Sequence, residues 1–439
     1  MSVHSAKSVR IWKMVLVLTA LFALVFASPI SSYAQKKKAK AAPELQKRVN
    51  FDISKIVWPN PPAIARIKFV QLYTGEKLDF NSPAGPPKPK QGWMDRLAGS
   101  KPVQDQNVKI PFQLIRTYGL GFDSKGKIYA ADQAAGAIFV FDPEDRYKVE
   151  LIRNGSDAHF GLIVGLAIDD NDRIFVSDDK LRHIAVINAQ HHEETTFGAD
   201  VLARPGGLAI DKENRLLYAV DTESDVVDVF DADSFKFLRK IGVSGKKHTL
   251  TDPGTFSLPT NVAVDKDGNV YVTDTLNDRV EIFDADGQFI STFGKNGDGP
   301  GFFARPKGIA VDNDGHIWVV DAVQERVQVF DRDGRLLIYF GEHGGFPGQF
   351  QVPYDIAIDG KTNRVIVSEQ YQGRVQMFRY ITDAEAEQLR KEKDAQQGKT
   401  VASAEPKKDV APVPAGAPAP KDTASKDAAP AQAKPPIKQ

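Results

Sequence analysis

The segment Arg305–Gly341, RPKGIAVDNDGHIWVVDAVQERVQVFDRDGRLLIYFG, decides the fold of this chain. Apolar residues alternate with other residues in four short runs, which predict β-strands at Gly308–Asp312, Ile317–Asp321, Val327–Asp331 and Leu336–Phe340. The turns between these strands carry Asp and Gly, as in DNDG and DRDG, and indicate an antiparallel meander. Because one four-stranded meander cannot bury both of its faces, this segment needs copies of itself to pack against.

Six copies of the segment are present. The Asp that ends the first strand recurs every 42–54 residues or so, which is the spacing of propeller blades: Asp123, Asp169, Asp211, Asp265, Asp312 and Asp359. Each second strand ends in an acid: Asp132, Asp178, Asp221, Asp274, Asp321 and Glu369. Four residues before each first-strand Asp stands a residue type that tolerates positive φ, so we expect a left-handed residue there: Gly119, Gly165, Gly207, Asn261, Gly308 and Asp355.

The fourth and fifth copies, PTNVAVDKDGNVYVTDTLNDRVEIFDADG and PKGIAVDNDGHIWVVDAVQERVQVFDRDG, resemble NHL repeats. This resemblance covers roughly residues 58–380 and implies an all-β fold, a six-bladed β-propeller of four-stranded antiparallel blades. The first two copies depart from the pattern, because they lack the Pro before the Gly and the Asn-Arg-Val run. NHL-type propellers include binding modules, sensor domains and a few enzymes, so the resemblance implies a fold more than a function.

Composition excludes several classes of function. The chain has 57 basic and 57 acidic residues, but acids outnumber bases between Asp105 and Tyr380, which argues against a nucleic-acid partner. The absence of cysteine excludes disulfides, thiolate metal sites and a cysteine nucleophile.

The N-terminus has the three parts of a secretory signal. Basic Met1–Lys13 precedes the apolar run Met14–Ala27, and small residues follow up to Ala34. We expect cleavage after Ala34, because the apolar run is shorter than the ~20 residues that span a bilayer. An uncleaved membrane anchor is the alternative. The sequence therefore predicts a signal peptide at 1–34 and a periplasmic or extracellular protein without a transmembrane segment after cleavage.

The propeller is expected to close through its N-terminal segment. Residues 35–57 form a basic flexible leader, and residues 58–75 follow as a strand-like run ending in Thr74-Gly75. The last copy stops after its third strand, at Tyr380, so residues 58–75 are the natural supplier of its fourth strand. Pairing the two would remove two open sheet edges. Residues 76–110 are a Pro-rich insertion that we interpret as a cap or, alternatively, a helix that docks a partner.

Two polar segments follow the propeller. Thr382-Asp383-Ala384-Glu385 has the form of a capping box and predicts a short polar helix over residues 381–398. Residues 399–439 are rich in Ala, Pro and Lys and contain almost no large apolar residue. We expect this tail to be disordered, because it cannot bury enough apolar surface to fold.

The two faces of such a propeller differ in their loops. Turns after the first and third strands are short and define a tight-turn face; loops after the second and fourth strands are longer and define a long-loop face. Variable loops on a rigid scaffold are where binding usually occurs, so the long-loop face is the predicted site. Four aromatic residues on it are expected to be exposed and to contact a partner, although packing between blades is the alternative: Phe302, Phe303, Phe346 and Phe350.

Charged residues on the same face have two interpretations. His183, Arg279, Arg326 and Arg374 stand five residues after the acid that ends the second strand. They either pack structurally against acids and loops or form a partial cationic ring for carboxylate or sulfate groups. The six second-strand acids either satisfy backbone donors or, as the alternative, hold an axial cation. The DKDG and DNDG segments lack the later ligands of a calcium loop and are interpreted as tight turns.

An enzyme is the alternative to a binding protein. Some NHL-type propellers are lyases with several histidines around zinc, and similar six-bladed lactonases hold a divalent ion with Glu, Asn and Asp. Five histidines fall in the variable loops without fixed spacing: His159, His191, His192, His248 and His343. We therefore predict a monomeric, non-catalytic binding or scaffold propeller without a required cofactor, which contacts a protein or another envelope ligand through its long-loop face. The alternative is a metal-dependent lyase or lactonase-like enzyme, with calcium or zinc in a site at the central channel.

Overall fold

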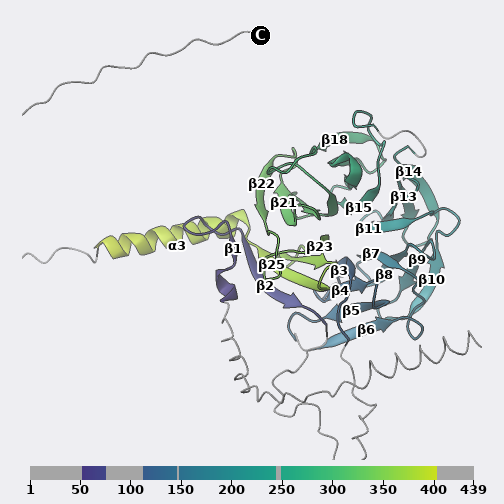
Figure 1. Ribbon diagram of the computed structural model, residues 1–439, viewed down its shortest axis with the longest axis horizontal. Helices are drawn as coiled ribbons and strands as arrows, with labels where there is room; N and C mark the ends of the chain where they lie inside the picture. The colour runs from purple at the N-terminus through teal and green to yellow at the C-terminus, as the bar shows by residue number, and fades with distance from the viewer. Residues whose placement is uncertain (1–51, 76–111, 146–147, 244–248, 403–439) are drawn as a thin grey trace, which may run out of the picture. The chain divides into compact units, whose positions relative to one another are not determined.

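The computed structural model describes residues 52–75, 112–145, 148–243 and 249–402, which form a ring of six antiparallel β-sheets (Figure 1). The first strands of the blades contact one another around the centre: β3 (Thr117–Phe122), β7 (Ile163–Ile168), β11 (Pro205–Asp211), β15 (Pro259–Val264), β19 (Pro306–Val311) and β23 (Pro353–Asp359). The second strands are β4 (Ile128–Asp132), β8 (Ile174–Asp178), β12 (Leu216–Asp221), β16 (Val270–Asp274), β20 (Ile317–Asp321) and β24 (Arg364–Glu369).

Third and fourth strands complete each blade toward the outside. The third strands are β5 (Ala137–Phe141), β9 (His183–Ile187), β13 (Val226–Asp231), β17 (Arg279–Phe283), β21 (Arg326–Phe330) and β25 (Arg374–Tyr380). The fourth strands are β6 (Val149–Arg153), β10 (Glu193–Phe197), β14 (Phe237–Ile241), β18 (Phe289–Phe293) and β22 (Leu336–Phe340), with β2 (Ile67–Tyr73) in the last blade. The predicted six-bladed propeller is confirmed, and the segment Arg305–Gly341 forms the fifth blade, β19–β22.

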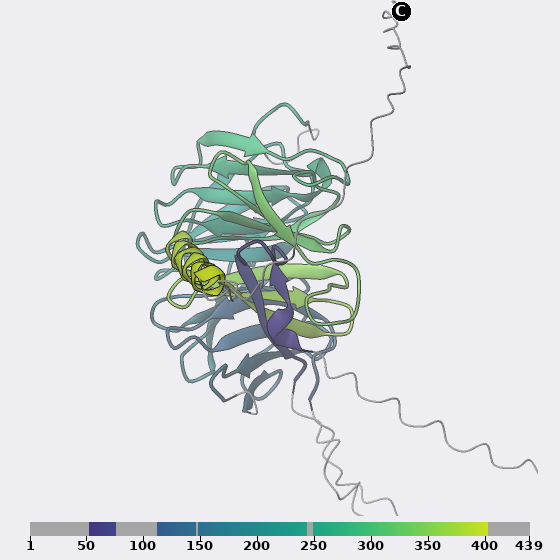
Figure 2. The same cartoon turned by 90° about the vertical axis from the view of Figure 1, so that its left-hand side faces the viewer.

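The predicted closure by the N-terminal segment is also confirmed. Strand β2 pairs with β25 in antiparallel register from Ile67↔Tyr380 to Tyr73↔Val375. Figure 2 shows the purple N-terminal strands lying along the green strands of the last blade. A short strand β1 (Val57–Trp58) adds a fifth strand outside β2, which was not expected. The ring is therefore closed by the pairing of β2, from the N-terminal part of the chain, with β25 of the last blade.

Apolar side chains from neighbouring blades form the core. One cluster joins Trp318 and Phe340 of the fifth blade to Phe378 and Ile67 of the sixth, all within 1% of full burial. The remaining blade interfaces hold clusters of the same kind. Each large apolar side chain buried in this way stabilises the fold by roughly 1.5–3 kcal/mol.

The glycines at the start of the innermost strands have a different role from the expected one. We predicted left-handed backbone at Gly119 and its five counterparts, but none of the six has a positive φ. Instead, a Cβ on Gly119 would lie 2.6 Å from the backbone oxygen of Val164, and one on Gly308 would lie 2.6 Å from the Cα of Asp355. Glycine is needed there because backbones of adjacent blades approach one another closely around the axis. We call these six positions the glycine ring, although Asn261 and Asp355 occupy two of them.

The predicted capping box begins helix α3 (Asp383–Ala402). The backbone N–H of Thr382 donates to Glu385 Oε2 at 3.2 Å, and that of Glu385 donates to Thr382 Oγ1 at 3.3 Å. The helix extends beyond residue 398, the predicted end, into the first residues of the predicted tail, which begins at residue 399. No described helix combines the length and the apolar character needed to cross a bilayer. The predicted signal peptide, the leader up to residue 51, the insertion at 76–110 and the tail from 403 lie outside the described residues.

Candidate functional site in the central channel

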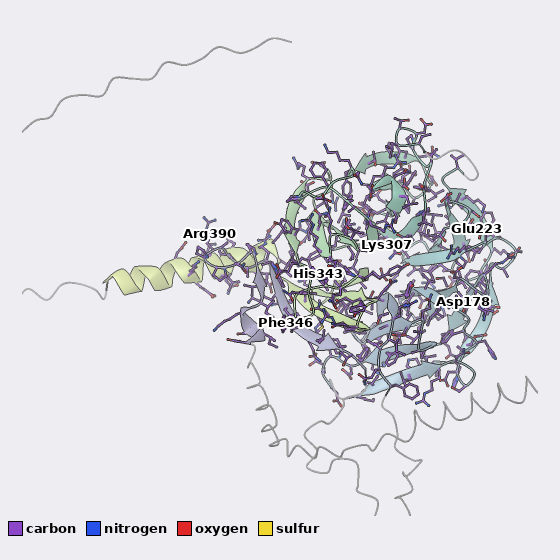
Figure 3. The ribbon with its side chains drawn as sticks, viewed as in Figure 1. Asp178, Glu223, Lys307, His343, Phe346 and Arg390 are labelled. Atoms are coloured by element: carbon purple, nitrogen blue, oxygen red, sulfur yellow. The ribbon has the colours of Figure 1, made fainter. Side chains whose placement is uncertain are left out.

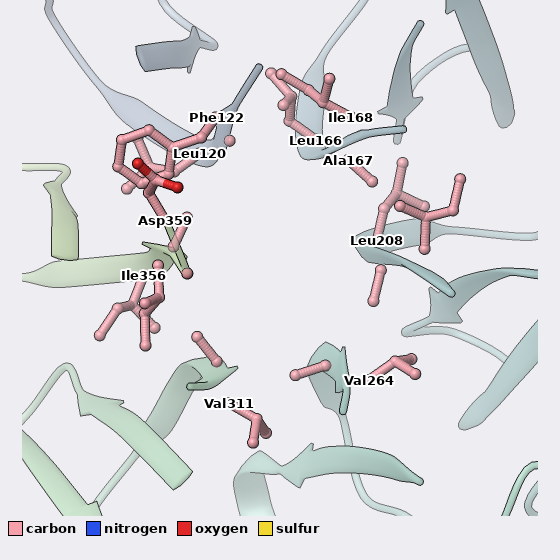
Figure 4. Close-up of a pocket in the computed structure, with 18 of the residues that line it drawn as sticks. Leu120, Phe122, Leu166, Ala167, Ile168, Leu208, Val264, Val311, Ile356 and Asp359 are labelled. Carbon is pink, nitrogen blue, oxygen red and sulfur yellow. The ribbon is translucent and has the colours of Figure 1, made fainter. Parts of the chain in front are cut away.

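The innermost strands surround a cavity of about 580 Å³ on the axis of the ring. Residues from every blade line it, most of them aliphatic, and Figure 4 shows 18 of them around the opening. Representative wall residues are Leu120, Leu166, Leu208, Val264, Val311 and Ile356. The lining runs from the middle of each innermost strand to its C-terminal end, so the cavity opens on the tight-turn face. Concave, mostly apolar sites with few polar groups are typical of small-molecule binding.

The rim of this cavity is built from the tight turns themselves. The Asp that ends each innermost strand accepts backbone N–H groups of its own turn; Asp312 Oδ1, for example, accepts from His316 N at 2.8 Å. Turns of adjacent blades are joined as well, because Lys361 Nζ donates to Ser124 O at 3.0 Å and Asn313 Nδ2 donates to Gly360 O at 2.8 Å. These two contacts join the rim turn of the sixth blade to the turns of the first and fifth blades.

The DKDG and DNDG segments are tight turns, as predicted. Gly268 N donates to Asp265 O at 3.1 Å, and Gly315 N donates to Asp312 O at 3.0 Å. In the second turn, Asp312 lies with Asp314 and His316 in a group close enough to share an ion. However, Asp312 Oδ2 already contacts His316 Nδ1 and the indole N–H of Trp318, each at 3.0 Å. This group therefore has a structural explanation.

A polar pair forms the floor of the cavity at the glycine ring. Asn261 Nδ2 donates to Asp355 Oδ1 at 2.7 Å, between the fourth and sixth blades. The other carboxylate oxygen of Asp355 accepts from Leu120 N at 3.0 Å. Asn261 Oδ1 is buried and accepts no hydrogen bond from the described residues. We refer to Asn261 and Asp355 together as the channel floor.

The environment of Asp355 changes its acidity. Burial raises the pKa of Asp355 to about 7, although hydrogen bonds from Ile356, Leu120 and Asn261 act in the opposite direction. A carboxyl group that holds its proton near neutral pH can donate as well as accept a hydrogen bond. A perturbed titratable group at the end of an apolar cavity is a common property of functional sites.

This pKa predicts a specific pH dependence of stability. Between the unfolded pKa of about 4 and the folded pKa near 7, the folded chain keeps a proton that the unfolded chain has released, so the free energy of unfolding falls as pH rises. In Asp355→Asn this loss is absent. We expect urea midpoints at pH 5 and pH 8.5 to lie closer together in Asp355→Asn than in the wild type. Asp200→Asn alters an exposed acid, so its two urea midpoints should differ by as much as those of the wild type. If the difference between the midpoints decreased equally in both variants, the raised pKa would not belong to Asp355.

The six acids that end the second strands are buried structural groups. Asp132 Oδ2 accepts from Ile115 N at 2.6 Å and from Arg116 N at 2.8 Å, in the segment that leads into the first blade. The other acids bond the loop entering their blade in the same way: Asp178, Asp221, Asp274, Asp321 and Glu369. All six are at most 1% exposed. Their oxygens therefore fix the incoming loops, which supports the backbone-donor interpretation over an axial cation site.

Two of the predicted arginines also fix loops. Arg279 Nε donates to Asp274 Oδ2 at 2.8 Å, and its Nη1 donates to Leu250 O at 3.0 Å. Arg374 Nε donates to Glu369 Oε1 at 2.7 Å. Both guanidinium groups are buried, at 5% exposure or less. They lie within the blades and do not form a cationic ring around the channel.

The remaining two cationic candidates are also not gathered at one site. Arg326 Nη2 donates to Asp298 O at 2.7 Å, and its guanidinium lies 5.2 Å from the ring centre of Tyr339 on an outer strand. His183 begins the third strand of the second blade, and its Nε2 is buried without a described hydrogen-bond partner. The four predicted cations therefore belong to separate blades.

The expected exposure of the four aromatic residues is wrong for two of them. Phe303 and Phe350 are fully buried, because each fills the gap between consecutive blades. Phe302 is half-buried, with Lys295 Nζ 4.8 Å from its ring centre. Phe346 is 65% exposed and is labelled at the edge of the ring in Figure 3. Of the four, Phe346 retains the surface that a partner would need.

The described loop histidines do not form a three-histidine zinc site. They contact separate groups: His159 lies beside Glu193, His191 bonds Tyr129 Oη at 3.1 Å, and His343 pairs with Glu325. His248 lies outside the described residues. Sequence reasoning also missed the channel floor, although a signal was present: Asn261 and Asp355 are the two positions that depart from glycine in the ring.

Comparison with known proteins agrees with the fold. A family model described as a six-bladed β-propeller matches residues 256–334. A probable peptidyl-alpha-hydroxyglycine alpha-amidating lyase from Caenorhabditis elegans is 34% identical over 109 residues, which cover 25% of this chain and 30% of the lyase. The aligned part thus spans less than a third of that relative.

Solved structures with similar folds have low sequence identity. A protein of unknown function from Bacteroides thetaiotaomicron is 20% identical, with 61% of this chain and 70% of that chain covered and a TM-score of 0.49. A gluconolactonase from Xanthomonas campestris is 17% identical, with 61% and 86% covered and a TM-score of 0.47. Virginiamycin B lyase from Staphylococcus aureus is 14% identical, with 61% and 95% covered and a TM-score of 0.45.

Proposed function

We propose that this protein is a non-catalytic binding propeller of the cell envelope, and that its channel cavity takes a small molecule with an apolar body. The observation that carries the proposal is the aliphatic cavity of about 580 Å³ that ends on Asp355. Removing apolar ligand surface from water would supply affinity, and the protonated carboxyl would give one directed hydrogen bond. The sequence pointed to the long-loop face, whereas this cavity opens on the opposite one.

The arrangement of groups favours binding over acid–base catalysis. Within the described channel, Asp355 is the one titratable side chain at the floor, since the other charged groups of the lining lie at the rim. The rim acids are engaged in their turns; hydrogen bonds from Arg215 and Arg173 lower the pKa of Asp169 despite its burial. General acid–base catalysis of hydrolysis or elimination commonly needs two groups within reach of the reacting atoms.

A metal-dependent lyase or lactonase is the second candidate. One observation favours it: the free Oδ1 of Asn261 lies beside Asp355, and amide and carboxylate oxygens are ligands for hard divalent ions. The lyase activity for which the Caenorhabditis elegans relative is named points the same way. Elemental analysis of the purified protein distinguishes the two candidates. Near-stoichiometric zinc or calcium that is lost in Asn261→Leu would support the enzyme and contradict the binding proposal.

Filling the cavity should abolish ligand binding without unfolding the ring. The neutral apolar fluorophore N-phenyl-1-naphthylamine is a suitable probe, and Val264→Trp adds bulk at a residue that lines the cavity. We expect its dissociation constant, measured by fluorescence titration, to rise at least about tenfold, or roughly 1.4 kcal/mol. Leu337→Trp is the matched control, because Leu337 is 52% exposed on an outermost strand. Equal loss in both variants, or none in Val264→Trp, would contradict the proposal.

The envelope location is a proposal that rests on the N-terminal sequence alone. Basic residues, the apolar run Met14–Ala27 and the small residues before Gln35 support export and cleavage. Cell fractionation followed by N-terminal sequencing tests it. A mature chain beginning near Gln35 in the periplasmic or secreted fraction is expected, and an intact Met1 in the membrane pellet would contradict it.

A further inference from the structure

A second set of side chains lies at the long-loop end of the channel. The channel floor separates these side chains from the cavity. Tyr118, Lys307 and Tyr354 each stand directly before a glycine-ring position, in the first, fifth and sixth blades. The ring centres of Tyr118 and Tyr354 are 4.5 Å apart, and Lys307 Nζ lies 5.8 Å from that of Tyr354. Figure 3 labels Lys307 near the middle of the propeller. We call these three residues the channel mouth.

The cation of the channel mouth lacks a neutralising partner. Among the described residues, Lys307 Nζ makes no hydrogen bond or ion pair, and it contacts the face of Tyr354 instead. Burial and the nearby Arg305 lower the pKa of Lys307 to about 8. Two acids act on the tyrosines: Asp355 is bonded by Asn261 and by Leu120 N, and Asp179 is paired with Arg204 at 3.2 Å. A half-buried ammonium without an acid is costly for the empty protein and is relieved by a bound anion.

The other members of the mouth are suited to hold a planar group. Burial raises the pKa of both Tyr118 and Tyr354, so their hydroxyls remain protonated and can donate hydrogen bonds. The equivalent positions in the second, third and fourth blades carry Val164, Gly206 and Thr260, which are small. The aromatic and cationic side chains are therefore gathered on one side of the axis, opposite a side with little bulk.

From this geometry we propose that the channel mouth binds the carboxylate of a small aromatic acid. The carboxylate contacts Lys307 Nζ, and the ring stacks against Tyr118 and Tyr354, where an aromatic contact adds about 0.5–1.5 kcal/mol beyond buried area. We expect a carboxylate in preference to a phosphate, because Lys307 is the one cation of the channel mouth and a carboxylate carries a single negative charge. The site lies on the other side of the channel floor from the cavity and uses different residues, so it does not depend on the function proposed above.

The test compares charged and neutral forms of one probe on the full-length mature protein. Titration with benzoate, followed by ligand-observed NMR, should show saturable binding, whereas benzamide, which has the same ring without the charge, should not bind measurably. In Lys307→Met the dissociation constant of benzoate should rise at least about tenfold, while Lys307→Arg should stay within about threefold of the wild type. Because Lys307 lacks a partner acid, Lys307→Met should fold with an unchanged or higher melting temperature; Lys307→Gln serves as a second variant.

Three controls test whether benzoate binds at Lys307 through its carboxylate. Lys266→Met removes a cation on the tight-turn face and should leave benzoate binding unchanged. Val264→Trp fills the cavity and should also leave it unchanged, which separates this proposal from the preceding one. Inorganic phosphate should compete weakly. Equal affinity for benzamide, unchanged affinity in Lys307→Met, loss only in Val264→Trp, or tighter binding of phosphate than of benzoate would each overturn the proposal.

Discussion

Deleting residues 36–75 should prevent cooperative folding of the propeller, because this removes the strand that closes the ring. Strand β2 pairs with β25 over most of its length, and Ile67, Phe69 and Tyr73 on it are at most 6% exposed. Four to five ladder hydrogen bonds are worth about 1 kcal/mol each, and the three side chains roughly 1.5–3 kcal/mol each. That sum is comparable with the whole stability of a typical domain, about 5–15 kcal/mol. Circular dichroism and thermal melting measure the loss.

Two comparisons separate ring closure from a general effect of truncation. Deletion of residues 403–439 should leave the melting temperature nearly unchanged. Within the strand, Phe69→Ala should cost about 3–5 kcal/mol by leaving a cavity. The adjacent Val70→Ala should cost much less, because Val70 is 37% exposed on the other side of the strand. Equal effects of the two truncations, or of the two point substitutions, would show that closure does not stabilise the fold.

Sequence periodicity was sufficient to predict the fold. The predicted strand Ile317–Asp321 matches β20 residue for residue, because alternation and the Asp-Gly turns are local signals. Ring closure could be predicted too, since a blade ending at Tyr380 lacks its outer strand and the segment before Gly75 had no other blade to join. The capping box at Thr382–Glu385 is local in the same sense.

Burial of loop residues was harder to predict, because it depends on the neighbouring blade. Phe303 and Phe350 lie in glycine-rich loops that suggest exposure, but each stands three residues before the proline that opens the next blade. Leu202 and Phe256 hold the same place, and all four are at most 2% exposed. This position is therefore part of the repeat, and aligning on the proline rather than on the strand-ending Asp would have revealed it.

The candidate site depends on geometry that no local pattern contains. Sequence identified the long-loop face because its loops are long, yet the described cavity opens between the short turns of the opposite face. Loop length says nothing about the space left between six innermost strands, which follows from the size of their side chains near the axis. Arg279 and Arg374 have the charge expected of a ligand site. Their guanidinium groups, however, are already hydrogen-bonded to loop carbonyls and buried acids of the protein itself.

Replacing Gly119 by Asn should be among the most damaging single substitutions in the chain. A Cβ at Gly119 would lie 2.6 Å from Val164 O and 2.7 Å from Leu166 N, which are backbone atoms of an innermost strand and cannot rotate away. Overpacking of a rigid core typically costs about 1–3 kcal/mol, and a backbone clash shared between two blades should lie at or above that range. Denaturant unfolding gives the difference.

The choice of Asn makes this a test of why glycine is there. Asn tolerates left-handed backbone, so a glycine kept for its positive φ should accept Asn with a loss below about 1 kcal/mol. Gly268 is such a position, with φ +82°, and a Cβ added there would meet its nearest atom at an ordinary 3.4 Å. Gly268→Asn should therefore remain near wild-type stability while Gly119→Asn unfolds readily. If both variants were equally stable, close approach of neighbouring blades would not be the reason for glycine at position 119. The innermost strands would then have to move apart enough to accept a side chain that the distances at Gly119 exclude.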